Sequence, residues 1–133
     1  MPTQTTELPD RWLLPLRGSQ VVGINLGENV AFLLDSSVRI IVGYGACFTR
    51  GGLRAPGVEP VTLAQRDGSE IQRSVGTTVL SAVGFKIGAM RIVFDNGWFL
   101  TVGIKDKESF VPAAVISGDT VLWMRTAPSA HQS

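Results

Sequence analysis

The sequence predicts a mainly β protein, in which two tandem three-stranded antiparallel β units pack as a sandwich or a partly open barrel with at most one short helix. Three observations lead to this prediction. Hydrophobic residues make up 44% of the chain and charged residues 17%, which is typical of a folded domain. Short runs rich in Val, Ile, Leu, Phe and Trp recur between turn residues. Two stretches, "AFLLDSSVRIIV" (31–42) and "RIVFDNGWFLTV" (91–102), share the order strand, acidic turn, strand, which indicates an internal repeat.

The length of 133 residues fits a single domain. We expect this β domain to cover residues 12–125. Residues 1–11 and 126–133 are expected to be flexible tails, because they are polar or contain proline and lack periodicity. Within the domain the predicted parts are repeat unit one at about 16–50, a connector at 51–74 and repeat unit two at about 75–124.

Eight segments have the composition of strands, since apolar and β-branched residues lie between turn signals. In chain order they are 20–26, 29–34, 38–42, 77–87, 89–94, 98–104, 110–116 and 120–124. Only residues 68–75 are predicted to be helical. Ser69 is the expected N-cap of that helix, and Ile71 and Val75 lie one turn apart.

The second repeated stretch can turn with two residues, Asn96 and Gly97, or with three, starting at Asp95. Three loop residues place Phe94 opposite Trp98 and make one sheet face wholly apolar, so Trp98 is predicted to be core. The same register pairs Ile92 with Leu100, Met90 with Val102 and, on the other face, Arg91 with Thr101.

A three-residue loop is also predicted for the first stretch, as Asp35-Ser36-Ser37. A two-residue turn there would force positive φ on both serines, which is unfavourable for residues with a Cβ. The resulting register pairs Leu34 with Val38, Phe32 with Ile40 and Val30 with Val42.

The similarity extends upstream, where "RGSQVVGI" (17–24) aligns with "VGTTVLSA" (75–82). Together with "FLLDSSVRIIV", "IVFDNGWFLTV" and the final "SGDTVLWM", these stretches resemble a family of small uncharacterised actinobacterial proteins, a domain of unknown function. Its members carry two tandem units of the type L-x-G-x-x-V … D-G-x-x-L-x-V. The resemblance covers residues 14 to 124, and the chain departs from it at Ser37, where the family pattern has glycine. The family implies the fold and no reaction.

Composition excludes several functional classes. The net charge is +1 and the basic residues are scattered, so we expect no nucleic-acid partner. No apolar run approaches the roughly 18 residues that span a bilayer, so we expect no membrane contact. The start of the chain lacks the features of a secretory signal, and the single cysteine, Cys47, favours a reducing compartment. We therefore expect a cytoplasmic protein.

We expect neither an enzyme nor a cofactor. His131 and Cys47 cannot supply the three or four ligands of a zinc or iron site. Cys47 has no histidine within the predicted ordered domain to activate its thiol. Asp35, Asp95 and Asp119 lie at turns, where carboxylates bond nearby backbone N–H groups.

The sequence therefore favours a non-enzymatic protein-interaction domain with an unidentified protein partner, one concrete form being an immunity-type inhibitor of a cognate toxin. The predicted contact surface consists of Phe99, Arg91 and Thr101 on the second sheet face, with Arg50 and Arg54 in the 50–60 segment facing an acidic partner.

Two other functions stay open. A small-molecule-binding β module would have a pocket between the two repeats, with Gly84, Phe85 and Gly88 as its predicted lining, because glycines leave room for a ligand. A self-associating structural domain would form a homodimer through an uncovered strand edge.

Overall fold

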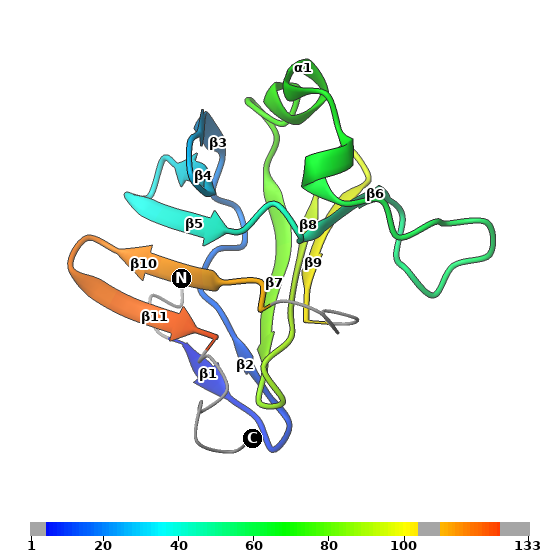
Figure 1. Cartoon of the computed structure of the whole chain (residues 1–133). Helices are drawn as coiled ribbons and strands as arrows, with labels where there is room; N and C mark the ends of the chain where they lie inside the picture. Colours follow the sequence, from blue (N-terminus) through cyan, green and yellow to red (C-terminus); the bar gives the residue numbers. More distant parts are fainter. Residues whose placement is uncertain (1–4, 104–109, 126–133) are drawn as a thin grey trace.

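The computed structural model of the chain describes residues 5–103 and 110–125, and these form two antiparallel β-sheets that pack face to face without closing into a barrel (Figure 1). Helical structure within the described residues is limited to the 3-10 turn η1 (Leu63–Gln65) and the helix α1 (Gly68–Gln72). The predicted fold class, mainly β with two antiparallel three-stranded units, is confirmed.

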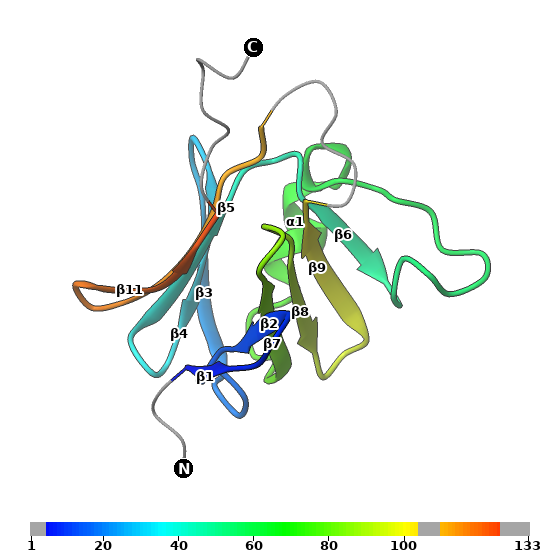
Figure 2. The ribbon, with the colours of Figure 1, turned by 90° about the horizontal axis from the view of Figure 1, so that it is seen from below.

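The first sheet has six strands in the order β1-β2-β7-β8-β9-β6. Its strands are β1 (Thr6–Glu7), β2 (Arg11–Leu13), β6 (Cys47–Arg50), β7 (Val79–Phe85), β8 (Met90–Phe94) and β9 (Trp98–Val102). The three-stranded unit β7-β8-β9 forms its centre. Viewed from below, this sheet and the five-stranded sheet appear as two splayed layers (Figure 2).

The second sheet has five strands in the order β11-β10-β5-β4-β3. Its strands are β3 (Val21–Leu26), β4 (Val30–Leu34), β5 (Val38–Val42), β10 (Ala113–Ser117) and β11 (Thr120–Met124). The three-stranded unit β3-β4-β5 supplies three of them, and the final hairpin β10-β11 extends the sheet beyond β5.

The register predicted for both hairpins is confirmed. In β4-β5 Phe32 lies opposite Ile40, and in β8-β9 Ile92 lies opposite Leu100. Both turns are closed by a backbone hydrogen bond of 3.1 Å from the third loop residue to the last residue of the preceding strand. The third loop residue has positive φ in both hairpins: 89° at Gly97 and 66° at Ser37, the latter being the position where a serine replaces the expected glycine.

A short antiparallel crossing joins the two sheets at the start of each unit. Gln20 forms an isolated β-bridge with Thr78. Around it, the N–H groups of Gly18 and Gly76 donate to the carbonyls of Val79 and Val21, each at 2.8 Å, so the contacts are reciprocal. Both glycines have positive φ, 89° and 94°, which allows each chain to turn away from the crossing into its own sheet.

The two turn aspartates support this crossing. The carboxylate of Asp35 accepts a hydrogen bond of 3.0 Å from the backbone N–H of Gln20, and Asp95 accepts one of 3.1 Å from Thr78. These aspartates accept backbone N–H groups as expected, but the donors lie 15 and 17 residues earlier in the chain and not in the turns themselves. Each carboxylate ties the tip of its own unit's hairpin to the crossing.

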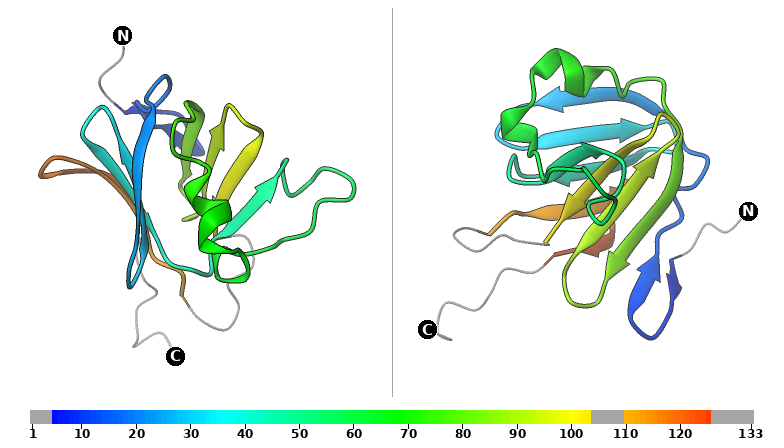
Figure 3. Two further views of the ribbon diagram at one scale, coloured as in Figure 1. Left: turned by 90° about the horizontal axis from the view of Figure 1, so that it is seen from above. Right: turned by 90° about the vertical axis from the view of Figure 1, so that its right-hand side faces the viewer.

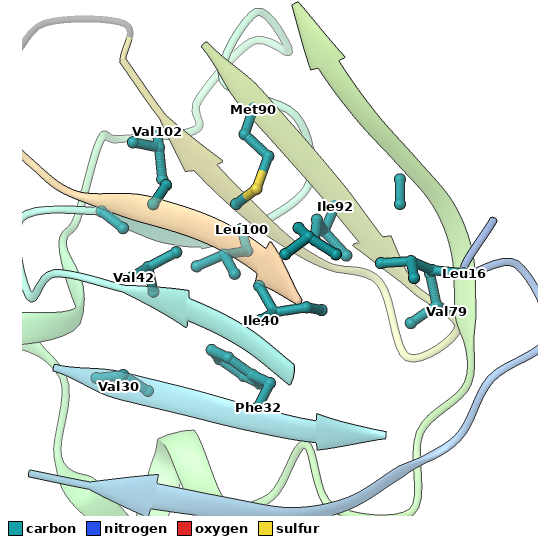
Figure 4. Packing of buried hydrophobic residues seen from close by; sticks show 14 of the residues in the cluster. Leu16, Val30, Phe32, Ile40, Val42, Val79, Met90, Ile92, Leu100 and Val102 are labelled. Carbon is teal, nitrogen blue, oxygen red and sulfur yellow. The ribbon is translucent and has the colours of Figure 1, made fainter. Parts of the chain in front are cut away.

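The core lies between the inner faces of the two sheets. Figure 4 shows side chains from both sheets meeting there, including Phe32 and Ile40 from one and Met90 and Leu100 from the other. Phe32 packs on Phe94 with ring centroids 5.7 Å apart. Trp98, predicted to be core, is 9% exposed and stacks on Phe48 at 4.7 Å.

Three local features differ from the sequence prediction. The predicted flexible tail, 1–11, contributes to two strands: residues 6–7 form β1 and residues 11–13 form β2. They are ordered because β2 pairs with the edge of β7 and β1 pairs with β2. The segment 47–50 is a strand, β6, and it crosses from the first unit into the sheet of the second by pairing with β9. The tail residues 1–4 and 126–133 lie outside the described residues.

The third difference concerns the helix. Its N-cap is Asp67 rather than Ser69, and it ends at Gln72. The Glu70 carboxylate accepts a hydrogen bond of 3.2 Å from the Asp67 backbone N–H, while the Ser69 hydroxyl donates to the Asp67 carboxylate at 2.9 Å. Ser69 therefore supports the cap from inside the first turn.

The strained turn of the first hairpin generates a prediction. Replacing Ser37 by glycine removes the cost of a side chain at positive φ, so Ser37→Gly is expected to raise the free energy of unfolding by about 1 kcal/mol. Urea denaturation followed by tryptophan fluorescence measures this change.

The neighbouring Ser36→Gly variant is the matched control, because Ser36 does not have positive φ and its hydroxyl lies 3.0 Å from that of Ser19. This variant is expected to be less stable than the wild type. If both glycine variants change stability in the same direction, the left-handed residue is not the source of strain.

Candidate functional site

The predicted contact residues are brought together only in part. Arg91, Thr101 and Phe99 share the outer face of the six-stranded sheet, because Arg91 pairs with Thr101 and Val93 with Phe99 (Figure 3, right, looks onto β7, β8 and β9 from this side). Phe99 is half-buried and Thr101 is only 7% exposed, so Thr101 offers little surface to a partner.

The two other predicted contacts lie elsewhere. Arg50 pairs with Trp98 on the inner side of the sheet, and its guanidinium lies 5.5 Å from the Trp98 ring. Arg54 is exposed in the segment 51–60, which projects from the end of β6 (Figure 1). The base of that segment contacts the outer face, since a Cβ on Gly52 would lie 3.4 Å from the Phe99 ring.

Arg91 has an unusual environment on this outer face. Its side chain is half-buried between Val83 and Thr101, and its Nε is buried without a hydrogen-bond acceptor. Among the described residues, no carboxylate forms an ion pair with it. Its guanidinium carbon lies 5.9 Å from the Phe85 ring. A buried donor without an acceptor costs about 1–3 kcal/mol of stability. The position of the Arg91 Nε is therefore unfavourable for the isolated domain.

Arg11 is the informative neighbour of Arg91. Arg11 lies on β2, opposite Phe85 on the neighbouring strand β7, and its guanidinium is 5.0 Å from the Phe85 ring. Arg11 is paired with Asp10 through two hydrogen bonds of 3.0 and 2.9 Å, and this pairing lowers the pKa of the Asp10 carboxyl. Two arginines therefore lie against the Phe85 ring: Arg11 is paired with a carboxylate, whereas Arg91 has no such pair in the described part of the chain.

The predicted pocket at the glycines of β7 is partly filled. A Cβ on Gly84 would lie 2.5 Å from Nε1 of Trp123, so the indole from β11 occupies the space that the missing side chain leaves. Gly84 is therefore a packing residue for the opposite sheet and does not line an open cavity. This contact joins the two sheets at the end remote from α1 (Figure 1).

A groove remains beside this contact, and two of the three predicted lining residues, Phe85 and Gly88, belong to it. Its volume is about 430 Å³, and it is lined by Thr5, Trp12, Phe85, Lys86, Gly88 and residues 121–125. Lys86 closes one side, with its Nζ 2.6 Å from the Glu7 carboxylate and 4.9 Å from the Trp12 ring.

The outer face of the five-stranded sheet was not predicted as a functional surface. Its register brings two rows of outward side chains together: Ala31, Ile41, Ala114 and Met124 in one, and Leu33, Arg39, Ile116 and Val121 in the other. Arg39 is the one charged side chain in these rows. Val121 and Met124 are 52% and 55% exposed, and the other apolar members are half-buried. We call these eight residues the apolar face.

A sequence signal for the apolar face exists. The strands "VAFLL", "VRIIV" and "AAVIS" carry apolar residues at nearly every position instead of alternating apolar and polar ones. Continuous apolar strands are typical of sheets covered on both sides. The core residues Val30, Phe32 and Ile40 occupy the inward-facing alternate positions of these strands. The apolar residues at the outward-facing positions therefore indicate a second face that is covered.

The described residues contain no arrangement that indicates a metal centre: no group of three or more His, Cys, Asp or Glu side chains is suitably placed. His131 lies outside the described residues. Cys47 is half-buried at the edge strand β6, and burial raises the pKa of its thiol, which lowers its reactivity as a nucleophile. No described helix is long and apolar enough to cross a membrane.

The fold and its surfaces define a two-sheet β domain with uncovered sheet faces and a small groove at one end. Comparison of the sequence identifies its family: the chain belongs to the Family of unknown function (DUF6188), which matches residues 12–110. The expectation of a family of unknown function is therefore confirmed, while the β10-β11 hairpin lies beyond the matched region. No curated protein and no solved structure matches the chain.

The contact between Gly84 and Trp123 generates a prediction. Gly84→Ala places a methyl group against the indole, and because this part of the core is closely packed, the variant is expected to lose about 1–3 kcal/mol of stability. Gly23→Ala is the control, since its nearest side-chain contact would be an ordinary 3.5 Å to Leu33. Equal stability of the two variants in thermal denaturation would contradict the packing role of Gly84.

The environment of Arg91 generates a second prediction about stability. Arg91→Met keeps the apolar stem and removes the unsatisfied donor, so the free energy of unfolding is expected to stay the same or to rise by about 1 kcal/mol. Arg66→Met is the comparison, because the Arg66 Nε donates to the Phe48 carbonyl at 3.0 Å and its guanidinium lies 4.8 Å from the Trp98 ring. That variant is expected to be less stable by about 1–2 kcal/mol in urea denaturation. A comparable loss in Arg91→Met would mean that the chain itself satisfies Arg91.

Proposed function

We propose that this protein is a non-enzymatic protein-interaction domain that docks a partner protein on the apolar face of its five-stranded sheet. One observation carries the proposal: two adjacent rows of outward side chains contain a single charged residue, Arg39. The solvent-facing side of an antiparallel sheet is normally polar. A contiguous apolar surface on a folded domain marks an interaction site.

The composition of the apolar face suits a protein partner better than a small ligand. Its apolar members come from β4, β5, β10 and β11, so they spread over the breadth of the sheet and are not gathered around one cavity. Arg39, on the central strand β5, supplies a single charge within the apolar surroundings. A partner that buries this face would bring an acceptor for Arg39.

A binding role is supported by Cys47, because burial raises the pKa of its thiol and so lowers its reactivity as a nucleophile. A toxin inhibited by this domain is one partner of the proposed kind.

We also propose that the two β units are copies of one building block, on the basis of their reciprocal contacts at the Gln20–Thr78 crossing. We further propose that the domain acts in the cytoplasm, on the basis of its single cysteine.

The proposal is tested with Ile41→Lys, which places a charge at the centre of the apolar face while its long stem preserves packing. The tagged wild type is expected to retain a partner from its host that can then be purified, and Ile41→Lys is expected to bind this partner at least about tenfold more weakly in a titration.

Leu80→Lys is the matched control, because Leu80 is an apolar residue of β7, 48% exposed, in the other sheet. Retention of the partner by Ile41→Lys, or equal loss in both variants, would overturn the assignment of the surface. Sedimentation of the wild type as a stable dimer that Ile41→Lys dissolves would identify the partner as a second copy instead.

A small-molecule site in the groove is the second candidate. The volume of about 430 Å³ lies within the range of ligand pockets, and Trp12 and Phe85 supply aromatic lining. A thermal-shift screen with nucleotides, sugars and lipids tests it. A ligand that raises the melting temperature and changes Trp12 fluorescence would support the groove, and no shift across the screen would count against it.

A further inference from the structure

We propose that the outer face of the six-stranded sheet is a separate binding surface for an extended acidic peptide segment, whose carboxylate pairs with Arg91. The surface consists of the half-buried side chains Phe85, Arg91, Val93 and Phe99, which lie around the buried Val83. It lies on the opposite sheet from the apolar face, and the inference does not depend on the function proposed there.

The first step is the unmet hydrogen-bonding capacity of Arg91. Its Nε is buried and has no acceptor, and no carboxylate among the described residues forms an ion pair with its guanidinium. A buried N–H group normally has a hydrogen-bond acceptor, and its absence at the Arg91 Nε is unfavourable. An acceptor supplied by a partner would complete this site.

The second step is the contrast with Arg11. Both guanidinium groups lie against the ring of Phe85, at 5.0 Å for Arg11 and 5.9 Å for Arg91. Arg11 holds the Asp10 carboxylate through two hydrogen bonds, so Asp10 is already engaged and, within residues 5–103 and 110–125, Arg91 forms no ion pair. Charge complementarity therefore selects an anionic group, and a planar carboxylate fits the guanidinium geometry.

The third step is the shape of the surroundings. Arg91 lies on an open sheet face, with Val83 and Thr101 as its direct neighbours across β7 and β9. Val93 and Phe99 form the next row, and Gly52 at the base of the 51–60 segment lies against the Phe99 ring. A carboxylate flanked by apolar side chains in an extended chain matches this arrangement, because alternate side chains of a strand project on one face.

The probe is a library of short random peptides displayed on phage and selected on the full-length protein. Selected peptides are expected to share an Asp or Glu next to apolar residues. A synthetic selected peptide is expected to bind the Arg91→Met variant at least about tenfold more weakly than it binds the wild type. The same peptide with its acidic residue changed, Asp→Asn or Glu→Gln, is expected to bind the wild-type protein at least about tenfold more weakly than the original peptide does. The double change is expected to add little further loss, because the two groups act as a pair.

Arg39→Met serves as the matched control, since it removes the lone charge of the apolar face and leaves the six-stranded sheet intact. Several outcomes would overturn the inference: no selected peptide, selected peptides without an acidic residue, additive losses in the double change, or loss of binding in Arg39→Met instead of Arg91→Met. The last outcome would place the acidic partner on the apolar face and would support the function proposed there.

Discussion

The structure depends on the antiparallel crossing between residues 18–21 and 76–79. At this point the two β units exchange backbone hydrogen bonds through Gly18 and Gly76, and each chain then turns into its own sheet. The carboxylates of Asp35 and Asp95 bind the backbone N–H groups of the bridge, so the tip of each hairpin is held at the same place. The relative position of the two sheets follows, because both units are tied to one short segment.

The crossing holds the two sheets together at one end, and side-chain packing holds them together over the rest of their length. Trp123 packs on Gly84 at the far end, where the absence of a Cβ allows the indole to approach the backbone of β7. Near α1, Arg66 covers the Trp98 ring and bonds the Phe48 carbonyl. Between these points the inner faces bury a continuous apolar core, and burial of this surface is the main favourable contribution to folding.

Once both inner faces are used, the outer faces determine what the protein can contact. The five-stranded sheet presents an apolar surface with one charge, whereas the six-stranded sheet presents aromatic and aliphatic side chains around Arg91, whose buried Nε has no acceptor among the described residues. The half-buried apolar side chains of the five-stranded sheet still gain from their partial burial, whereas the buried Nε of Arg91 without an acceptor is unfavourable. We propose that both outer faces bind partners.

The sequence by itself determined eight of the eleven described strands, the registers of the two Asp-led hairpins and the burial of Trp98, because side-chain alternation and turn chemistry act between residues close in the chain. It also indicated Phe85 and Gly88 as groove residues and Arg91 as a candidate contact. Only the tertiary structure decided that β6 joins the six-stranded sheet, that Trp123 fills the space at Gly84 and that Arg50 lies over Trp98. These contacts join segments distant in sequence, and no local pattern specifies which sheet edge or side chain lies opposite another.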